Sequence, residues 1–200
     1  MHPNPLFRVE DRTLLESLVE EIGFGMIFAQ TPDGPRVAHV PLVMGGEGTL
    51  QFHLARGNAL TRHIAGPGAL AVVNGPDAYV SPRWYAERGQ VPTWNYLALE
   101  LEGPVRQMDE NGLHGLLEAI GARKEARIPS GAPWRPRDVA ADYWSRLMRG
   151  IVGFELEIRA WRPTFKLSQN KPGEERERIA AALETNGAPA IAALMRRFAA

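Results

Sequence analysis

Alternation of apolar and polar residues with a period of two recurs along the chain and predicts β-strands. The clearest case is Val152–Ile158, in which four apolar residues alternate with Gly153, Glu155 and Glu157. Further strands are expected at Phe24–Phe28, Arg36–Val43, Thr49–Ala55, Ala69–Asn74, Leu97–Glu102 and Trp161–Leu167. This many strands, most of them antiparallel, predicts a mainly β (α+β) fold, namely a β-barrel.

Helical spacing of apolar residues interrupts the strands and predicts peripheral helices. The expected helices are Asp11–Glu20, the segment that follows Asp109, Ala140–Arg149, Glu174–Glu184 and Pro189–Phe198. Asp109 has the side chain that a helix N-cap requires, and Asn186-Gly187 is a C-cap signal between the last two helices. The final helix carries a full apolar stripe, so it is expected to pack on the barrel or on a second protomer.

A glycine-rich loop, Met44–Gly48, lies between two of the expected strands and has hairpin length. Centring the hairpin on Gly46 places His39 directly across from His53, with the apolar residues on the opposite face. Two facing imidazoles could bind metal or haem, could hydrogen-bond an organic ligand, or could be polar residues on a partly wet face. Two ligands alone do not make a metal site, so none is assigned.

Five large aromatic side chains are concentrated in Asn74–Tyr96, together with three prolines. Because proline cannot donate to a β ladder, the segment does not read as a simple core strand. So many rings are also not typical of a disordered linker. The segment therefore predicts either the wall of a pocket for a flat ligand or a loop held over the core by its own rings.

The composition limits the function classes that fit the chain. Its 200 residues fit one domain, and 23 basic and 23 acidic residues give zero net charge. A dedicated DNA-binding domain usually has a basic face, which this balance does not favour. The chain has no cysteine, no apolar run of membrane-spanning length and no visible secretory signal. We therefore expect a cytoplasmic protein without disulfides or a thiol nucleophile.

Arg56 follows an expected strand where a short helical turn begins, with Asn58 two residues later. There it could bind a phosphate together with helix-start amides, or it could be a solvated surface charge. Dinucleotide-binding, P-loop, nucleophile-elbow and zinc-protease motifs do not occur in the chain. No catalytic residue is therefore assigned.

Five segments resemble the PaiB family in content and order: HLARGN (53–58), GPDAYVSPRWY (75–85), VPTWNY (91–96), IVGFELEI (151–158) and KLSQNK (166–171). That family is described as FMN-binding negative transcriptional regulators, and its fold resembles the flavin-binding split barrel of pyridoxamine-phosphate oxidases and flavin reductases. The resemblance implies FMN as the cofactor, a split-barrel domain at residues 1–170 and a helical extension at residues 171–200. It also implies a homodimer with the flavin at the subunit interface.

The resemblance leaves alternatives for the function. The chain could instead be an FMN-dependent oxidoreductase similar to flavin reductases, in which the flavin performs the chemistry. It could also be a haem-binding relative that uses His39 or His53 as an axial ligand. Only the description of the family implies DNA as a partner, because the neutral charge of the chain does not support DNA binding.

The resemblance also implies which residues contact FMN. By this resemblance, Arg56, Asn58 and Lys166 would bind the FMN phosphate. The floor of the flavin pocket would be formed by His39, His53 and the backbone of residues 54–55. Residues of the aromatic stretch would hold the flavin ring. The second protomer would contribute Lys166, Ser168 and Gln169. The full expected set is His39, Pro41, His53, Leu54, Ala55, Arg56, Asn58, Tyr79, Ser81, Thr93, Trp94, Asn95, Lys166, Ser168 and Gln169.

Overall fold

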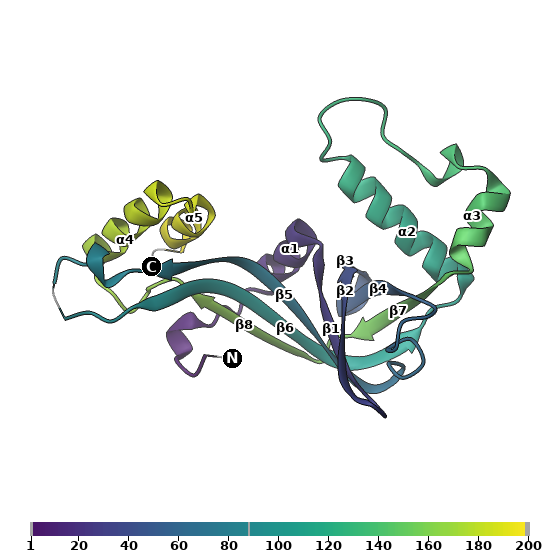
Figure 1. The fold of residues 1–200 in the computed structure, drawn as a ribbon, viewed down its shortest axis with the longest axis horizontal. Helices are drawn as coiled ribbons and strands as arrows, with labels where there is room; N and C mark the ends of the chain where they lie inside the picture. The colour runs from purple at the N-terminus through teal and green to yellow at the C-terminus, as the bar shows by residue number, and fades with distance from the viewer. Residues whose placement is uncertain (1, 88, 199–200) are drawn as a thin grey trace. The chain divides into compact units, whose positions relative to one another are not determined.

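A computed structural model describes residues 2–87 and 89–198 and contains eight strands and five α-helices over those ranges (Figure 1). The strands are β1 Phe24–Thr31, β2 Gly34–Pro41, β3 Val43–Met44, β4 Thr49–Ala55, β5 Gly66–Val80, β6 Thr93–Gln107, β7 Ile151–Glu157 and β8 Ala160–Lys166. The helices are α1 Arg12–Ile22, α2 Glu110–Glu125, α3 Ala141–Met148, α4 Gly173–Thr185 and α5 Pro189–Arg197. None of the described helices is long and apolar enough to cross a bilayer.

The strands form one sheet in the order β2-β1-β5-β6-β7-β4-β3, and β8 pairs with β6. Neighbouring strands whose register is resolved are antiparallel. The path is open, because it begins at β2 and ends at β3. The predicted antiparallel split β-barrel with peripheral helices is therefore confirmed.

The predicted hairpin between the two histidine-bearing strands is wrong. β2 pairs with β1, so that His39 lies opposite Met26. β4 pairs with β7, so that His53 lies opposite Gly153. The reason is a competing tight turn after Thr31, whose hydroxyl donates to the Gly34 carbonyl over 2.7 Å. The glycine-rich loop joins β4 to the two-residue β3 instead.

The chain folds into two compact units. Unit 1 comprises residues 1–12, 74–99 and 162–200, and unit 2 comprises residues 13–73 and 100–161. Strands β5, β6 and β8 each contribute residues to both units.

In unit 2 both faces of the sheet are covered. One face holds the main core, where Phe52 and Phe154 are fully buried and stack with ring centroids 5.7 Å apart. Helix α2 covers the other face, where Val43, Met108 and Leu116 form a smaller apolar cluster. The predicted cap of α2 is confirmed, because the Asp109 carboxylate accepts a hydrogen bond from the Gly112 amide over 2.7 Å.

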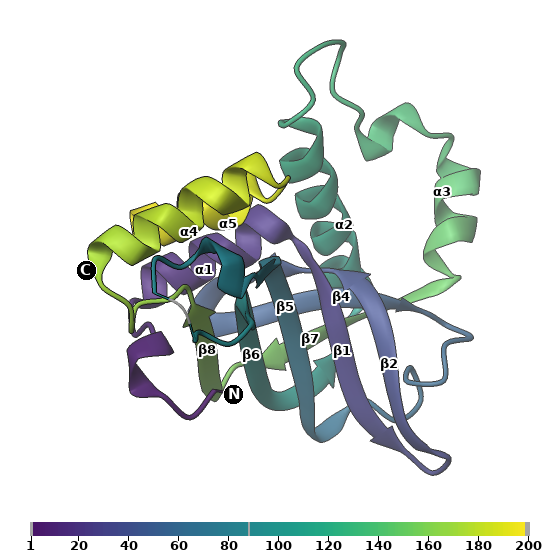
Figure 2. The same ribbon diagram turned by 60° about the vertical axis from the view of Figure 1, so that its left-hand side comes forward.

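In unit 1 the helices α4 and α5 lie side by side (Figure 2). The buried Arg176 joins them, because its Nη2 donates to the carbonyls of Met195 (2.7 Å) and Phe198 (3.0 Å). Those carbonyls belong to the end of α5, where a cation also stabilises the helix dipole. The predicted break between the two helices is confirmed, with Gly187 at φ 85°.

Candidate functional site

Unit 1 contains a polar cavity of about 230 Å³. Its lining combines two lysines, a histidine and several amide and hydroxyl groups. The lining residues are His2, Asn4, Phe7, Tyr85, Gln90, Val91, Thr93, Asn95, Lys166, Ser168, Asn170 and Lys171. No carboxylate is among them, and all twelve belong to the described part of the chain. The cavity therefore has the charge of an anion-binding site.

Among the residues that the structure describes, the two lysines have neutral partners. Lys166 Nζ donates to the Thr93 hydroxyl and, over 2.7 Å, to the Trp94 carbonyl. Lys171 Nζ donates to Gln90 Oε1 over 2.9 Å and lies 5.1 Å from the centre of the Tyr85 ring. Burial lowers the pKa of Lys166, because its charge is partly desolvated without a counter-charge. An anion in the cavity would offset that cost.

Buried hydrogen bonds hold the remaining polar wall of the cavity. Asn95 is fully buried; its amide donates to Ser168 Oγ over 3.0 Å, and the Ser168 hydroxyl donates back to Asn95 Oδ1 over 3.2 Å. Ser168 sits at φ 61°, a conformation that non-glycine residues rarely adopt. The Gln169 side chain accepts a hydrogen bond from the Leu167 amide over 2.8 Å and donates to the Phe165 carbonyl, so it bonds the backbone that leads into Ser168. This segment is therefore fixed in place by its own side chains.

The aromatic stretch divides between the two faces of β6. Thr93 and Asn95 line the cavity, and Trp94 lies between them, so its side chain points to the opposite face. There its indole N–H donates to Asp77 over 2.8 Å, and its ring meets Tyr79 edge-on at 5.8 Å. Of the expected ring-holding residues, neither of these two aromatics lines the cavity. Ser81 is also outside the lining, where its Oγ caps the Pro82–Trp84 turn.

Seven of the expected site residues lie in unit 2: His39, Pro41, His53, Leu54, Ala55, Arg56 and Asn58. His39 is exposed on β2, whereas Leu54 is buried in the main core. Asn58 is engaged locally, because its Oδ1 accepts from the Leu60 amide over 2.9 Å. Pro41 and Ala55 end β2 and β4.

His53 is half-buried on the sheet face that α2 covers. A Cβ on its cross-strand partner Gly153 would lie 3.1 Å from Met108 Sδ and 3.3 Å from Leu113, which shows how closely the α2 layer approaches. The His53 Nδ1 atom is buried and has no hydrogen-bond partner among the described residues. Burial accordingly lowers the pKa of His53 below its usual 6.5.

The lowered pKa of His53 predicts a loss of stability in acid. In the unfolded chain the imidazole has its ordinary pKa, so below pH 6.5 the unfolded state binds more protons than the folded state. The stability is complete above that pH and falls as the pH drops toward the folded-state pKa. We expect His53→Gln to reduce the decline in unfolding free energy between about pH 7.5 and about pH 5.5. His39→Gln, on an exposed histidine, should leave the decline intact; equal slopes in all three proteins would contradict the prediction.

Arg56 lies in a different environment from the lysines. Its Nε donates to the Arg149 carbonyl over 2.8 Å and its Nη2 to the Ile151 carbonyl over 3.3 Å. The adjoining cavity of about 260 Å³ is also lined by Asp109 and Glu110. A phosphate there would meet two carboxylates as well as the guanidinium.

Arg56→Ala is accordingly expected to destabilise the fold. The substitution removes two hydrogen bonds to the start of β7, so we expect a loss of about 1–2 kcal/mol in chemical denaturation. Arg56→Lys, which keeps the charge but not the forked geometry, should restore little of the lost stability. An Arg56→Ala protein of unchanged stability would show that these hydrogen bonds contribute nothing.

A family described as "Putative FMN-binding domain" matches residues 1–160. The chain is 28% identical over 172 residues to the protease synthase and sporulation protein PAI 2 of Bacillus subtilis, covering 82% of this chain and 80% of that protein.

Two solved structures have the same fold. The FAD and heme binding protein of Mycobacterium smegmatis superposes with a TM-score of 0.64 at 18% identity, covering 84% of this chain and 77% of that one. The flavocytochrome Anf3 of Azotobacter vinelandii superposes with a TM-score of 0.61 at 13% identity, covering 86% and 79%. At these identities the likeness establishes the fold alone.

Proposed function

The chain belongs to the FMN-binding family that matches residues 1–160, and on that premise we propose that it is a flavin-dependent regulatory protein of the PaiB type. The similarity to the PAI 2 protein, whose name refers to protease synthesis and sporulation, supports a regulatory role. We place that role in the cytoplasm. The cofactor is FMN, which supplies reversible electron and hydride transfer when bound.

The observation that carries the proposal is the carboxylate-free cavity of unit 1. FMN contains a single strongly anionic group, its phosphate. Lys166 and Lys171 offer two ammonium groups whose present partners are neutral, so a phosphate would convert them into charge-assisted hydrogen bonds. The cavity volume of about 230 Å³ is smaller than the usual pocket for a whole ligand of this size. It therefore suits the phosphate end rather than the entire cofactor.

The neighbouring polar groups would complete the phosphate site. Thr93 and Ser168 supply hydroxyls on the cavity wall, and Asn95 fixes the Ser168 side chain by the paired hydrogen bonds. The two lysines would share the charge of the phosphate, and the fixed backbone around Ser168 would hold these groups in place without further ordering. The roles of this chain's residues are thus binding and orientation.

The proposed assembly is a homodimer. Tyr79 and Trp94 are 46% and 50% exposed, although together they form a contiguous aromatic pair. Large exposed rings of this kind are frequent at protein interfaces. Sedimentation of the FMN-loaded protein should give a dimer, and Trp94→Lys should shift it toward monomer. A wild-type monomer at high micromolar concentration would contradict the assembly.

Reduction by nicotinamide cofactors separates the regulatory role from an FMN-dependent oxidoreductase. For the regulator, anaerobic mixing with NADH or NADPH should leave the yellow flavin oxidised over minutes. Rapid bleaching of the flavin would favour the enzyme.

Haemin titration should give no Soret shift through His53, because α2 covers that face. A Soret shift abolished by His53→Gln would favour the haem-binding relative.

Duplex DNA binding is expected to be weak for the protein alone. The net charge of zero provides little of the phosphate-neutralising surface on which DNA affinity depends. Regulation would then act through a protein partner or a small molecule. A nanomolar, sequence-specific mobility shift by the purified protein at physiological salt would contradict this expectation.

A further inference from the structure

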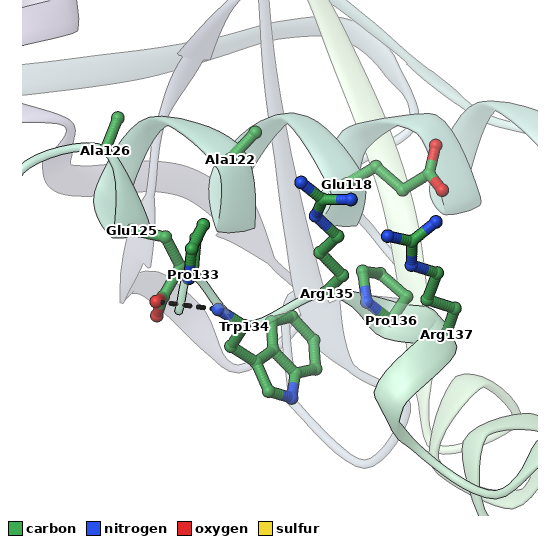
Figure 3. A pocket seen from close by; sticks show the side chains of 9 residues that line it. All are labelled: Glu118, Ala122, Glu125, Ala126, Pro133, Trp134, Arg135, Pro136 and Arg137. Atoms are coloured by element: carbon green, nitrogen blue, oxygen red, sulfur yellow. Dashed lines mark hydrogen bonds between the residues drawn. The ribbon is translucent and has the colours of Figure 1, made fainter. Parts of the chain in front are cut away.

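A further cavity lies entirely within unit 2 and shares no lining residue with the cavity of unit 1. It has a volume of about 460 Å³ and opens between α2 and the loop of residues 133–137 (Figure 3). That volume is within the usual range for small-molecule sites. None of the expected flavin contacts lies in this loop, although the loop falls within the residues that the family match spans.

The walls of the cavity are largely apolar. Ala122 contributes a small side chain from α2, while Pro133, Trp134 and Pro136 contribute rings from the loop. A small helical surface that faces an indole and two proline rings forms a slot for a flat ring system. The shape and chemistry therefore favour an aromatic ligand.

The loop is held in position against α2. The Trp134 amide donates to Glu125 Oε2 over 3.0 Å, so one carboxylate of the lining already has a partner. The indole packs so closely on the helix that a Cβ on Gly121 would lie 3.3 Å from it. The Arg135 amide in turn donates to Asp138 Oδ2 over 2.8 Å, at the start of a short helical turn. The slot is therefore formed before any ligand arrives.

One end of the cavity is cationic. Figure 3 shows the guanidinium groups of Arg135 and Arg137 together at the end where Glu118 lies. Neither guanidinium makes an ion pair with any residue in the ranges 2–87 and 89–198. Two cations thus face one carboxylate, and Glu118 itself is 3.8 Å from His114 Nδ1. A planar anion would find two forked donors at this end.

We propose that this cavity binds a flat aromatic carboxylate, with its ring against Trp134 and the two prolines of the loop and its carboxylate on Arg135 and Arg137. The apolar walls supply ring contact, and the guanidinium pair fixes the orientation and selects the charge. Such a ligand would be a small-molecule effector of the regulatory protein, bound apart from the flavin phosphate cavity.

The test is isothermal titration of the FMN-loaded protein with 2-naphthoate and with its neutral analogue 2-naphthamide. We expect 2-naphthoate to bind with one site per chain and 2-naphthamide to bind about tenfold more weakly or worse. Affinity for 2-naphthoate should also fall as the salt concentration rises. Equal affinity for both probes, or no heat from 2-naphthoate at millimolar concentration, would overturn the proposal.

Substitutions in the cavity lining test where the two probes bind. Arg135→Gln combined with Arg137→Gln should weaken 2-naphthoate about tenfold or more and leave 2-naphthamide unchanged. Trp134→Leu should weaken both probes. The matched control is Arg159→Gln, an exposed arginine of the same unit that pairs with Glu157 and lies outside the cavity. If the control weakened 2-naphthoate as much as the double variant, the cavity would not be the site; thermal denaturation of each variant verifies its fold.

Discussion

Replacement of both Lys166 and Lys171 by glutamine is expected to lower the affinity for FMN by about a hundredfold, or about 2.8 kcal/mol. Each lysine would make a charge-assisted hydrogen bond to the phosphate, and such bonds contribute about 1.5–3 kcal/mol each. Both side chains are partly exposed, so we take the lower part of that range. Quenching of flavin fluorescence during titration of the apo-protein measures the change.

Glutamine is chosen so that the variant keeps its fold. Its amide can still donate toward the Thr93 hydroxyl and the Trp94 carbonyl, which would otherwise lose the Lys166 donor. The control is Lys124→Gln. The exposed ammonium of Lys124 lies in unit 2, 3.4 Å from the Ile22 carbonyl. The control should bind FMN as the wild type does. If the double variant bound FMN with unaltered affinity, the assignment of the phosphate to this cavity would be wrong.

Gly103→Ala is expected to destabilise the protein by about 3 kcal/mol or more. A Cβ at this position of β6 would lie 1.7 Å from the Glu157 carbonyl oxygen and 2.9 Å from its carbon. Both are backbone atoms, so relief requires displacement of the chain at the end of β7. The neighbouring hydrogen bond from the Arg159 amide to the Glu102 carbonyl would be strained as well. Urea denaturation should show the loss directly.

Gly115→Ala is the matched control. Gly115 lies within α2, and a Cβ there meets no atom within 4 Å. Because alanine is the better helix former, this variant should be more stable than the wild type by about 0.5–1 kcal/mol. If both variants were destabilised equally, the loss at Gly103 would reflect glycine replacement in general and not the close approach of β6 to Glu157.

Local patterns predicted the elements well but not all their partners. Alternation located β7 and the middle of β6, and the N-cap chemistry of Asp109 located the start of α2. The predicted partner of β2 was wrong because two turns competed for it: the tight turn after Thr31 pairs β2 with β1, and β4 pairs with the distant β7. Alternation also cannot reveal that α2 shields one face of the sheet, so the burial of the His53 Nδ1 atom was not predicted.

The candidate site was predicted in part. The motif segments named Thr93, Asn95, Lys166 and Ser168, and the structure brings these four together around one cavity. Lys171 stands at the end of the KLSQNK segment and was missed, although its charge was a usable signal. Placing β6 from residue 93 onward would have shown that Trp94 points away from Thr93 and Asn95.

The N-terminal contribution to the cavity had no such signal. His2, Asn4 and Phe7 belong to a segment without apolar periodicity, and they reach the cavity through a short turn capped by the Asn4 side chain. The His2 ring meets Phe7 edge-on with centroids 4.7 Å apart. Contacts of this kind depend on how the chain returns to the sheet, which no local pattern records.

The most direct measurement is a comparison of FMN with riboflavin, which lacks the phosphate, in equilibrium titrations of the wild-type apo-protein. If the carboxylate-free cavity of unit 1 holds the phosphate, FMN should bind about a hundredfold more tightly than riboflavin. The difference between the two affinities should become smaller as salt is added. Equal affinities for the two flavins at low salt would contradict the account.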